Sequence, residues 1–128
     1  MSTGTEIVSV SARQVYSDRG HPGVEATVTT AGGAQGVAIC TAGISVGSHE
    51  VEFAYDGGKK WRGKGVMRAV NAVNERIAPA LVGMDAAHQQ AVDQAMLDLG
   101  KLKVGGNATA AVSAAALKAG AAALGIPL

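Results

Sequence analysis

The sequence predicts an α+β fold in which a three-stranded antiparallel meander is followed by a cluster of three to four helices. Up to residue 40, apolar and polar residues alternate, as they do in strands that bury one face. From residue 66 onward, the apolar residues recur at helical spacing instead. The 128 residues suit a single domain with no internal repeat, so the helices are expected to pack on one face of the sheet.

Three segments carry the strand pattern: residues 6–16, 24–30 and 35–40. Turn-forming residues separate them at 17–23 and at 31–34, and the second turn predicts a hairpin. The first third of the chain is therefore predicted to be a three-stranded antiparallel meander. The second strand alternates most clearly, and its expected core face consists of Val24, Ala26 and Val28.

The first helix is expected between residues 63 and 83, where Gly83 is a natural stop. Its core-facing positions recur every three or four residues: Val66, Val70, Val73, Ile77 and Leu81. The second helix is expected in residues 86–100, with Asp85 as its N-cap. The inward positions of this second helix are Val92, Met96 and Leu99.

The third helix is expected to begin near Asn107 and to run to about Leu124, where Gly125 and Pro127 end it. Ten of the eighteen residues from 107 to 124 are alanine. A helix with such small side chains can pack almost backbone to backbone against its neighbours.

The composition argues against binding of nucleic acid and against a membrane-spanning helix. Charged residues make up 16% of the chain and the formal net charge is +1, which is too balanced to favour nucleic acid. Only 3% of the residues are aromatic, so the core must be built mainly from small and aliphatic side chains. The alanine-rich end of the chain carries Lys118 and Pro127, which favours a soluble helix over a membrane span.

Cysteine content and the first residues point to a compartment. Cys40 is the only cysteine, so no intrachain disulfide can form, which fits a reducing environment. The first ten residues lack a basic region followed by a long apolar run, so no signal peptide is expected. These features predict a cytoplasmic protein.

Several short motifs occur in a fixed order along the chain. Arg13 precedes SDRGHPGVE at 17–25, and AGISVG follows at 42–47. DGGKKWRGKGV at 56–66 and GGNATAAVSAA at 105–115 continue the series. In this order the motifs resemble the amino-terminal domain of enolase (phosphopyruvate hydratase), and the resemblance covers nearly all of residues 1–128.

The resemblance implies a capping domain in a lyase of glycolysis that dehydrates a 2-phosphoglycerate-like acid with Mg²⁺. In that family a barrel carries the lysine base and the carboxylates of the first Mg²⁺. None of those barrel positions occurs in these 128 residues. We therefore expect Mg²⁺ to bind only together with an enolase-type barrel partner. The docking face left uncovered in this chain is expected to be covered by such a barrel subunit or by self-association.

Ser45, in the glycine-containing loop, is the position at which the resemblance implies a metal ligand. In enolases the matching serine closes over the site and gives oxygen ligands to the second Mg²⁺, which suits a hard cation. The alternative is a serine that only caps a turn. Three neighbours depart from the family pattern, because Ala42 and Val46 replace hydroxyl residues and Ile44 replaces a small alanine.

His49 and Glu50 follow this loop, also at family positions. One interpretation is a general acid–base pair. The alternative, which we favour, is that the two residues anchor the far end of the loop. His21 and His88 have no Cys, Asp or Glu at ligand spacing, so no zinc site is expected.

Arg13, Arg19 and Glu25 match residues that in enolases lie at the subunit interface, where this domain meets the partner's barrel through ion pairs. Their presence predicts that the docking surface is retained. The alternative is three exposed charges that each contribute little.

Three hypotheses for the function remain open from the sequence. The first is the separate small subunit of a split enolase-type lyase. The second is a non-catalytic binding or scaffold module derived from enolase, which the changes at Ala42 and Val46 favour. The third is a fragment cut at the domain border. We favour the first.

Overall fold

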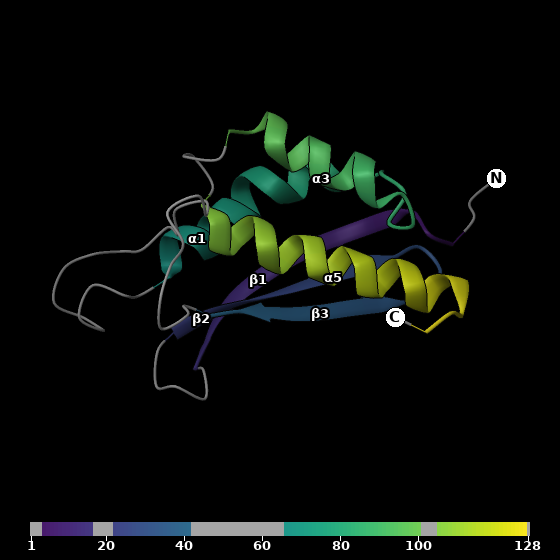
Figure 1. Cartoon of the computed structure of the whole chain (residues 1–128), viewed down its shortest axis with the longest axis horizontal. Helices are drawn as coiled ribbons and strands as arrows, with labels where there is room; N and C mark the ends of the chain where they lie inside the picture. The colour runs from purple at the N-terminus through teal and green to yellow at the C-terminus, as the bar shows by residue number, and fades with distance from the viewer. Residues whose placement is uncertain (1–3, 17–21, 42–65, 101–104, 128) are drawn as a thin grey trace, which may run out of the picture.

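The computed structural model describes residues 4–16, 22–41, 66–100 and 105–127. These residues form one antiparallel sheet whose helices all lie on the same side of it (Figure 1). The predicted α+β arrangement, a meander followed by helices, is therefore confirmed.

The sheet contains β1 (Ile7–Tyr16), β2 (Pro22–Thr30) and β3 (Gln35–Cys40), in that spatial order. Both neighbouring pairs are antiparallel, as a meander requires. The register of β1 on β2 shifts between Ile7 and Ser9. A shift of this kind explains why the alternation in this first strand is only approximate.

The predicted first helix is one continuous helical segment with three parts, α1 (Met67–Ala72), η2 (Val73–Ile77) and α2 (Ala78–Leu81). Its middle part, η2, is π-helical, which the periodicity of the sequence did not predict. Pro79 follows two residues later and has no N–H for the carbonyl four positions earlier. The five expected core positions are nevertheless all buried: Val66, Val70, Val73, Ile77 and Leu81.

The prediction for the start of the second helix was wrong. The helix α3 (Gln89–Asp98) begins three residues later than expected, and Asp85 is not its N-cap. The Asp85 carboxylate instead accepts a hydrogen bond from the Ala87 N–H at 2.9 Å, and the Asp85 carbonyl accepts one from the His88 N–H at 3.0 Å. Aspartate stabilises such turns as readily as it caps helices, and here the turn is what forms.

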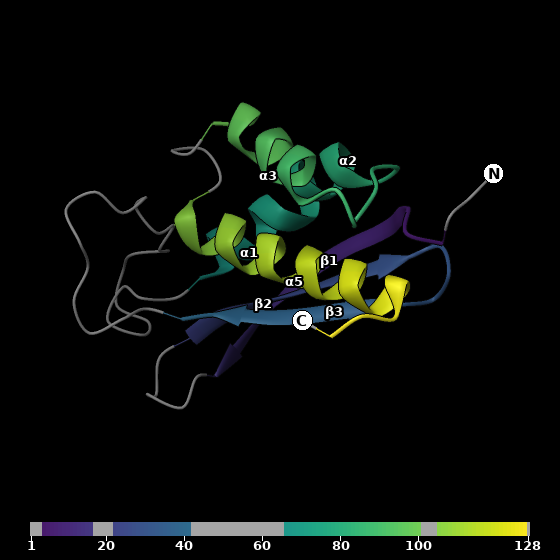
Figure 2. The same ribbon diagram turned by 45° about the vertical axis from the view of Figure 1, so that its right-hand side comes forward.

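The last helix, α5 (Gly106–Leu124), lies across β2 and β3 (Figure 2). It ends at Gly125, whose φ of 70° is the left-handed conformation typical of a glycine after a helix. The predicted close packing is confirmed at Gly36 of β3. A Cβ atom built on Gly36 would lie 2.0 Å from the Ala115 carbonyl oxygen and 2.4 Å from the Ala119 nitrogen.

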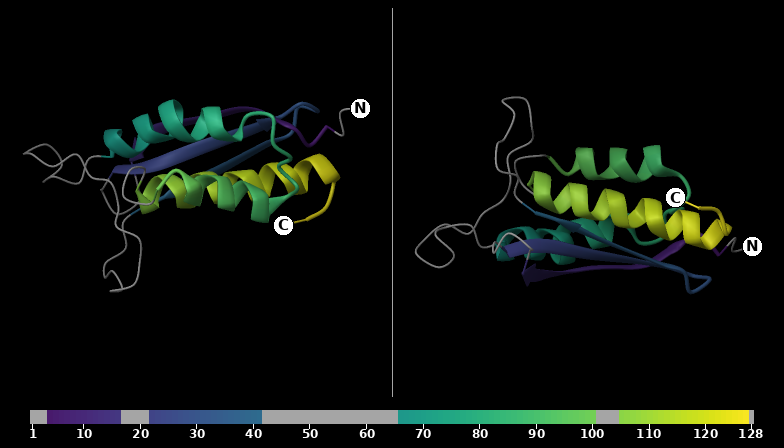
Figure 3. Two further views of the ribbon diagram at one scale, coloured as in Figure 1. Left: turned by 90° about the horizontal axis from the view of Figure 1, so that it is seen from above. Right: turned by 60° about the horizontal axis from the view of Figure 1, so that its bottom comes forward.

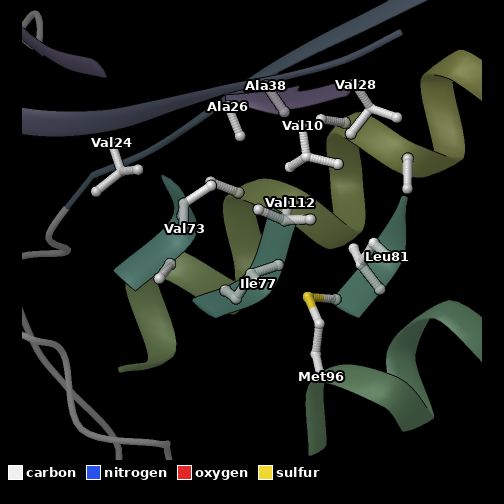
Figure 4. Packing of buried hydrophobic residues seen from close by; sticks show 14 of the residues in the cluster. Val10, Val24, Ala26, Val28, Ala38, Val73, Ile77, Leu81, Met96 and Val112 are labelled. Carbon is white, nitrogen blue, oxygen red and sulfur yellow. The ribbon is translucent and has the colours of Figure 1, made fainter. Parts of the chain in front are cut away.

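The core fills the space between the sheet and the helices, and it contains no aromatic side chain among the described residues. Figure 4 shows Val24 and Val28 of β2 pointing toward Ile77 of η2 and Val112 of α5. Met96 of α3 reaches the same cluster from the side opposite the sheet, at the bottom of this view. Viewed from other directions, the opposite face of the sheet has no described helix on it (Figure 3). We call this uncovered surface the open face.

Candidate functional site

Four of the six predicted site residues lie outside the described residues: Arg19, Ser45, His49 and Glu50. Arg13 and Glu25 are described, on β1 and β2. The candidate site is therefore described through the strands and helices that lie next to the undescribed segments.

These borders lie together at one end of the sheet, which we call the loop end. Tyr16 of β1 is the register partner of Pro22 of β2, on either side of the undescribed segment 17–21. Cys40, at the end of β3, lies opposite Val24, near the start of β2. The start of α1 and the start of α5 lie at the same end (Figures 1 and 2). Three undescribed segments are thus attached to one end of the fold.

A single row across the sheet joins the two sides of segment 42–65. In this row, which we call the anchor row, Gln14 pairs with Val24 and Val24 pairs with Cys40. The Gln14 side-chain carbonyl accepts a hydrogen bond from the Val66 N–H at 2.9 Å, on the far side of the segment. This bond also satisfies one of the N–H groups that a helix start leaves without an intrahelical partner.

Sequence reasoning missed the role of Gln14. The signal was present in the sequence, because Gln14 lies four residues after Val10 and therefore on the same, core-facing side of β1. A polar side chain at such a position needs a hydrogen-bond partner. The identity of that partner, more than fifty residues away in the chain, comes only from the structure.

Cys40 in the anchor row is half-buried and forms no disulfide. Burial raises the pKa of its thiol because the thiolate loses solvation. A thiol with a raised pKa is a weak nucleophile near neutral pH, so Cys40 is a packing residue here.

On the open face, Arg13 and Glu25 are directly opposite each other on neighbouring strands. The Arg13 Nε donates to Glu25 Oε1 at 2.7 Å, and this hydrogen bond, together with the charge of Glu25, raises the pKa of Arg13. The Arg13 side chain is 73% exposed and the Glu25 side chain 16%. The structure therefore joins two of the three predicted interface residues in one ion pair, which leaves most of the arginine accessible.

Two apolar side chains of β3 lie beside this ion pair on the open face. Ile39, 54% exposed, is the register partner of Glu25, and Val37, 42% exposed, is the partner of Thr27. Gly23 lies close to the end of β3, because a Cβ atom there would lie 2.9 Å from the Thr41 Cγ2 and 3.2 Å from the Cys40 carbonyl oxygen. The open face thus combines an ion pair, hydroxyl groups and two exposed aliphatic side chains.

The described residues do not form a metal centre. No group of three or more His, Cys, Asp or Glu side chains in ranges 4–16, 22–41, 66–100 and 105–127 is arranged to hold an ion. Mg²⁺ prefers several oxygen ligands in near-octahedral geometry. The described part of the chain therefore does not fit this ion by itself. In the same ranges, no helix combines the length and the apolar composition needed to cross a membrane.

An antiparallel meander covered by helices on one side defines a small α+β domain. The family model for the N-terminal domain of enolase matches residues 7–128. This chain belongs to the enolase N-terminal domain family.

Proposed function

We propose that this chain caps the active site of an enolase-type lyase, closing the Ser45-bearing loop over a 2-phosphoglycerate-like substrate held by a barrel on another chain. The observation that carries the proposal is the family match over residues 7–128. The anchor row supports it, because Cys40 and Val66, which flank segment 42–65, are held in one register at the loop end.

In this proposal Ser45 acts through its hydroxyl and carbonyl oxygens, which complete the coordination of an Mg²⁺ that the barrel binds. Such an ion stabilises negative charge on the reacting carboxylate. In this proposal the barrel would supply most of the ligands, because Ser45 alone cannot replace several of the waters around the ion. His49 and Glu50 hold the far end of the loop, or move a proton as an acid–base pair.

The proposal assigns the docking of the barrel to the open face. On this face Arg13 offers a guanidinium group that can bind a carboxylate in a bidentate geometry, and Glu25 offers a carboxylate to a partner arginine. We expect Arg19, which lies outside the described residues, to add a second guanidinium group. In this view the Arg13–Glu25 pair opens on docking, and each residue takes a partner across the interface.

The test is complementation. An enolase-type barrel without its own capping domain is assayed for conversion of 2-phosphoglycerate to phosphoenolpyruvate, with and without this chain. We expect no useful turnover from the chain alone and restored turnover from the mixture, since the reaction needs a base, an acid and bound cations that the barrel provides.

Ser45→Ala is expected to lower kcat by roughly tenfold or more while changing KM little, because loop closure acts mainly on the transition state. Ser48→Ala, in the same loop, is the matched control and should retain the activity of the unaltered chain. Robust turnover by the chain alone, or equal effects of the two serine substitutions, contradicts the assignment.

The second candidate is a non-catalytic scaffold derived from the same family, favoured by Ala42 and Val46 in place of hydroxyl residues. It predicts that the chain binds the barrel without changing its turnover. The two functions are therefore separated by measuring binding and turnover in the same mixture.

A further inference from the structure

The two edges of the sheet differ in how their backbone groups are satisfied. At the β1 edge, the Ile7 N–H donates to the Met84 carbonyl at 2.7 Å and the Gly83 N–H donates to the Ile7 carbonyl at 2.8 Å. Further along, the Asn74 side chain accepts from the Ala12 N–H at 3.0 Å and donates to the Ala12 carbonyl at 3.3 Å. The helical side of the fold therefore seals β1 at two places.

At the β3 edge, only one hydrogen bond from the helices to the strand backbone is found among the described residues. The Lys118 ammonium of α5 donates to the Val37 carbonyl at 3.0 Å. A carbonyl that accepts from outside the sheet points away from β2, and in an antiparallel strand the N–H of the same residue points the same way. Gln35 and Ile39 share this phase, so their backbone groups also face outward.

The outward groups of β3 are self-complementary. A second β3 placed antiparallel, with Val37 opposite the second Val37, would put Gln35 opposite Ile39 on both sides of a two-fold axis. Such pairing extends the sheet and places the exposed Val37 side chains of the two copies against each other, with each Ile39 opposite Gln35 of the other copy. An edge strand whose N–H and carbonyl groups point outward is a template for pairing with another chain unless something blocks it, and lysine is a common blocking residue.

Lys118 lies where it would block this pairing, because it contacts the outward Val37 carbonyl. Its Cβ packs close to Gly36, so the side chain extends from α5 over the strand to the outward carbonyl of Val37. In a two-fold pair, both Lys118 side chains would reach the shared edge, where neighbouring strands are only about 4.8 Å apart. Each copy would then lose its lysine–carbonyl bond, and two like charges would come together.

We propose that the free edge of β3 is a pairing surface for a second copy of this chain and that Lys118 keeps it closed. The lysine acts both as a hydrogen-bond donor to the edge and as a charge that repels its symmetry partner. Removal or neutralisation of this charge opens the edge.

The first test compares self-association of the whole chain and its Lys118→Ala variant by sedimentation equilibrium. Lys118→Ala is expected to lower the concentration for half-association by about tenfold or more, a change of at least about 1.4 kcal/mol. Lys118→Arg keeps the charge and the donor and should behave as the unaltered chain does. Arg76→Ala removes one positive charge from the exposed surface of η2 and should also leave association unchanged.

The second test identifies the surface by amide hydrogen exchange. In the unaltered chain, the Ala38 amide should be protected by β2 and the Val37 and Ile39 amides should exchange quickly. In Lys118→Ala, protection of Val37 and Ile39 should rise with protein concentration. Adding Val37→Pro, which removes an outward N–H and leaves the bonds to β2 in place, should reverse the association. Val37→Thr, which also changes the side chain but keeps the N–H, should not.

Two results overturn the proposal. One is a Lys118→Ala variant that associates no more strongly than the unaltered chain. The other is association in which the Val37 and Ile39 amides stay unprotected, since pairing through the open face would give that pattern. The exchange measurement decides the matter even where Val37→Pro does not fold.

Discussion

Asp85 shows how one side chain joins segments that are far apart in the sequence. It precedes α3, yet its carboxylate serves the turn and the N-terminal segment. A hydrogen bond from the Thr5 side chain, followed by the one from the Ala87 N–H, lowers the pKa of Asp85. Thr5 is buried, so this bond helps to hold the start of the chain against the turn.

The lowered pKa has a predictable effect on stability. Because the folded chain holds the Asp85 proton less tightly than the unfolded chain does, the carboxylate stabilises the fold above its unfolded pKa of about 3.9. This contribution is lost as the pH falls through the lower, folded-state pKa. Asp85→Asn should therefore reduce the free energy of unfolding at pH 7, by less than about 1 kcal/mol because the group is largely exposed.

The measurement is urea unfolding of both proteins at pH 7 and at pH 3. The difference between them should shrink at the lower pH. Glu75→Gln, which changes an exposed carboxylate on η2, is the control and should leave stability nearly unchanged. A difference between Asp85→Asn and the unaltered chain that is independent of pH contradicts the argument.

At the scale of elements, α5 is held between two backbones. Gly36 of β3 lets the strand approach one side, and Gly120 lets the turn at Ala86 approach another, since a Cβ on Gly120 would lie 2.7 Å from the Ala86 carbonyl oxygen. The alanine-rich composition of α5 is thus explained by the closeness of its neighbours.

Gly36→Ala should destabilise the fold by about 2–3 kcal/mol, because the new methyl group would overlap the backbone of α5 and the backbone cannot move aside as a side chain can. The measurement is the free energy of unfolding in urea. Gln35→Ala, at the exposed neighbouring position, is the control and should change it by less than about 0.5 kcal/mol. Equal effects at the two positions would show that α5 does not rest on Gly36.

A polar cluster joins α3 to α5. The Ser113 hydroxyl donates to the Asp93 carboxylate at 2.7 Å, and the Gln89 side-chain amide donates to the Ser113 hydroxyl at 2.9 Å. Ser113→Ala should lower the free energy of unfolding by about 1–2 kcal/mol, since it removes a hydrogen bond to a charged group. In an Asp93→Ala background the same change should have less effect. Strict additivity would show that the bond contributes nothing.

The same elements show what the sequence can predict. Helical spacing gave the core positions of the first helix correctly, because burial follows periodicity whether the turn is α or π. It missed η2, since neighbouring apolar positions are three or four apart in both forms. The Asp85 prediction failed because one residue type stabilises both turns and helix starts. Gln14 and Asn74 bond to residues distant in sequence, which no local pattern reveals.

For the molecule as a whole, the structure has one covered and one open sheet face, and its described residues have no metal-binding group. We therefore expect the chain alone to bind Mg²⁺ weakly or not at all, because Ser45 by itself cannot replace several of the waters around the ion. Calorimetric titration with Mg²⁺ checks this, with Ser45→Ala as the control. Tight binding by the unaltered chain, lost in Ser45→Ala, would show that a complete site exists here.

The sealed edge of β1 limits what kind of assembly this sheet can form. A sheet with two open edges can add one copy after another and grow into a filament. Here Met84, Gly83 and Asn74 occupy the backbone groups of Ile7 and Ala12, so among the described strands β3 is the edge that removal of Lys118 leaves for pairing. When β3 pairs with β3 of a second copy, the outward backbone groups of both strands are satisfied. Assembly through this sheet therefore stops at two copies.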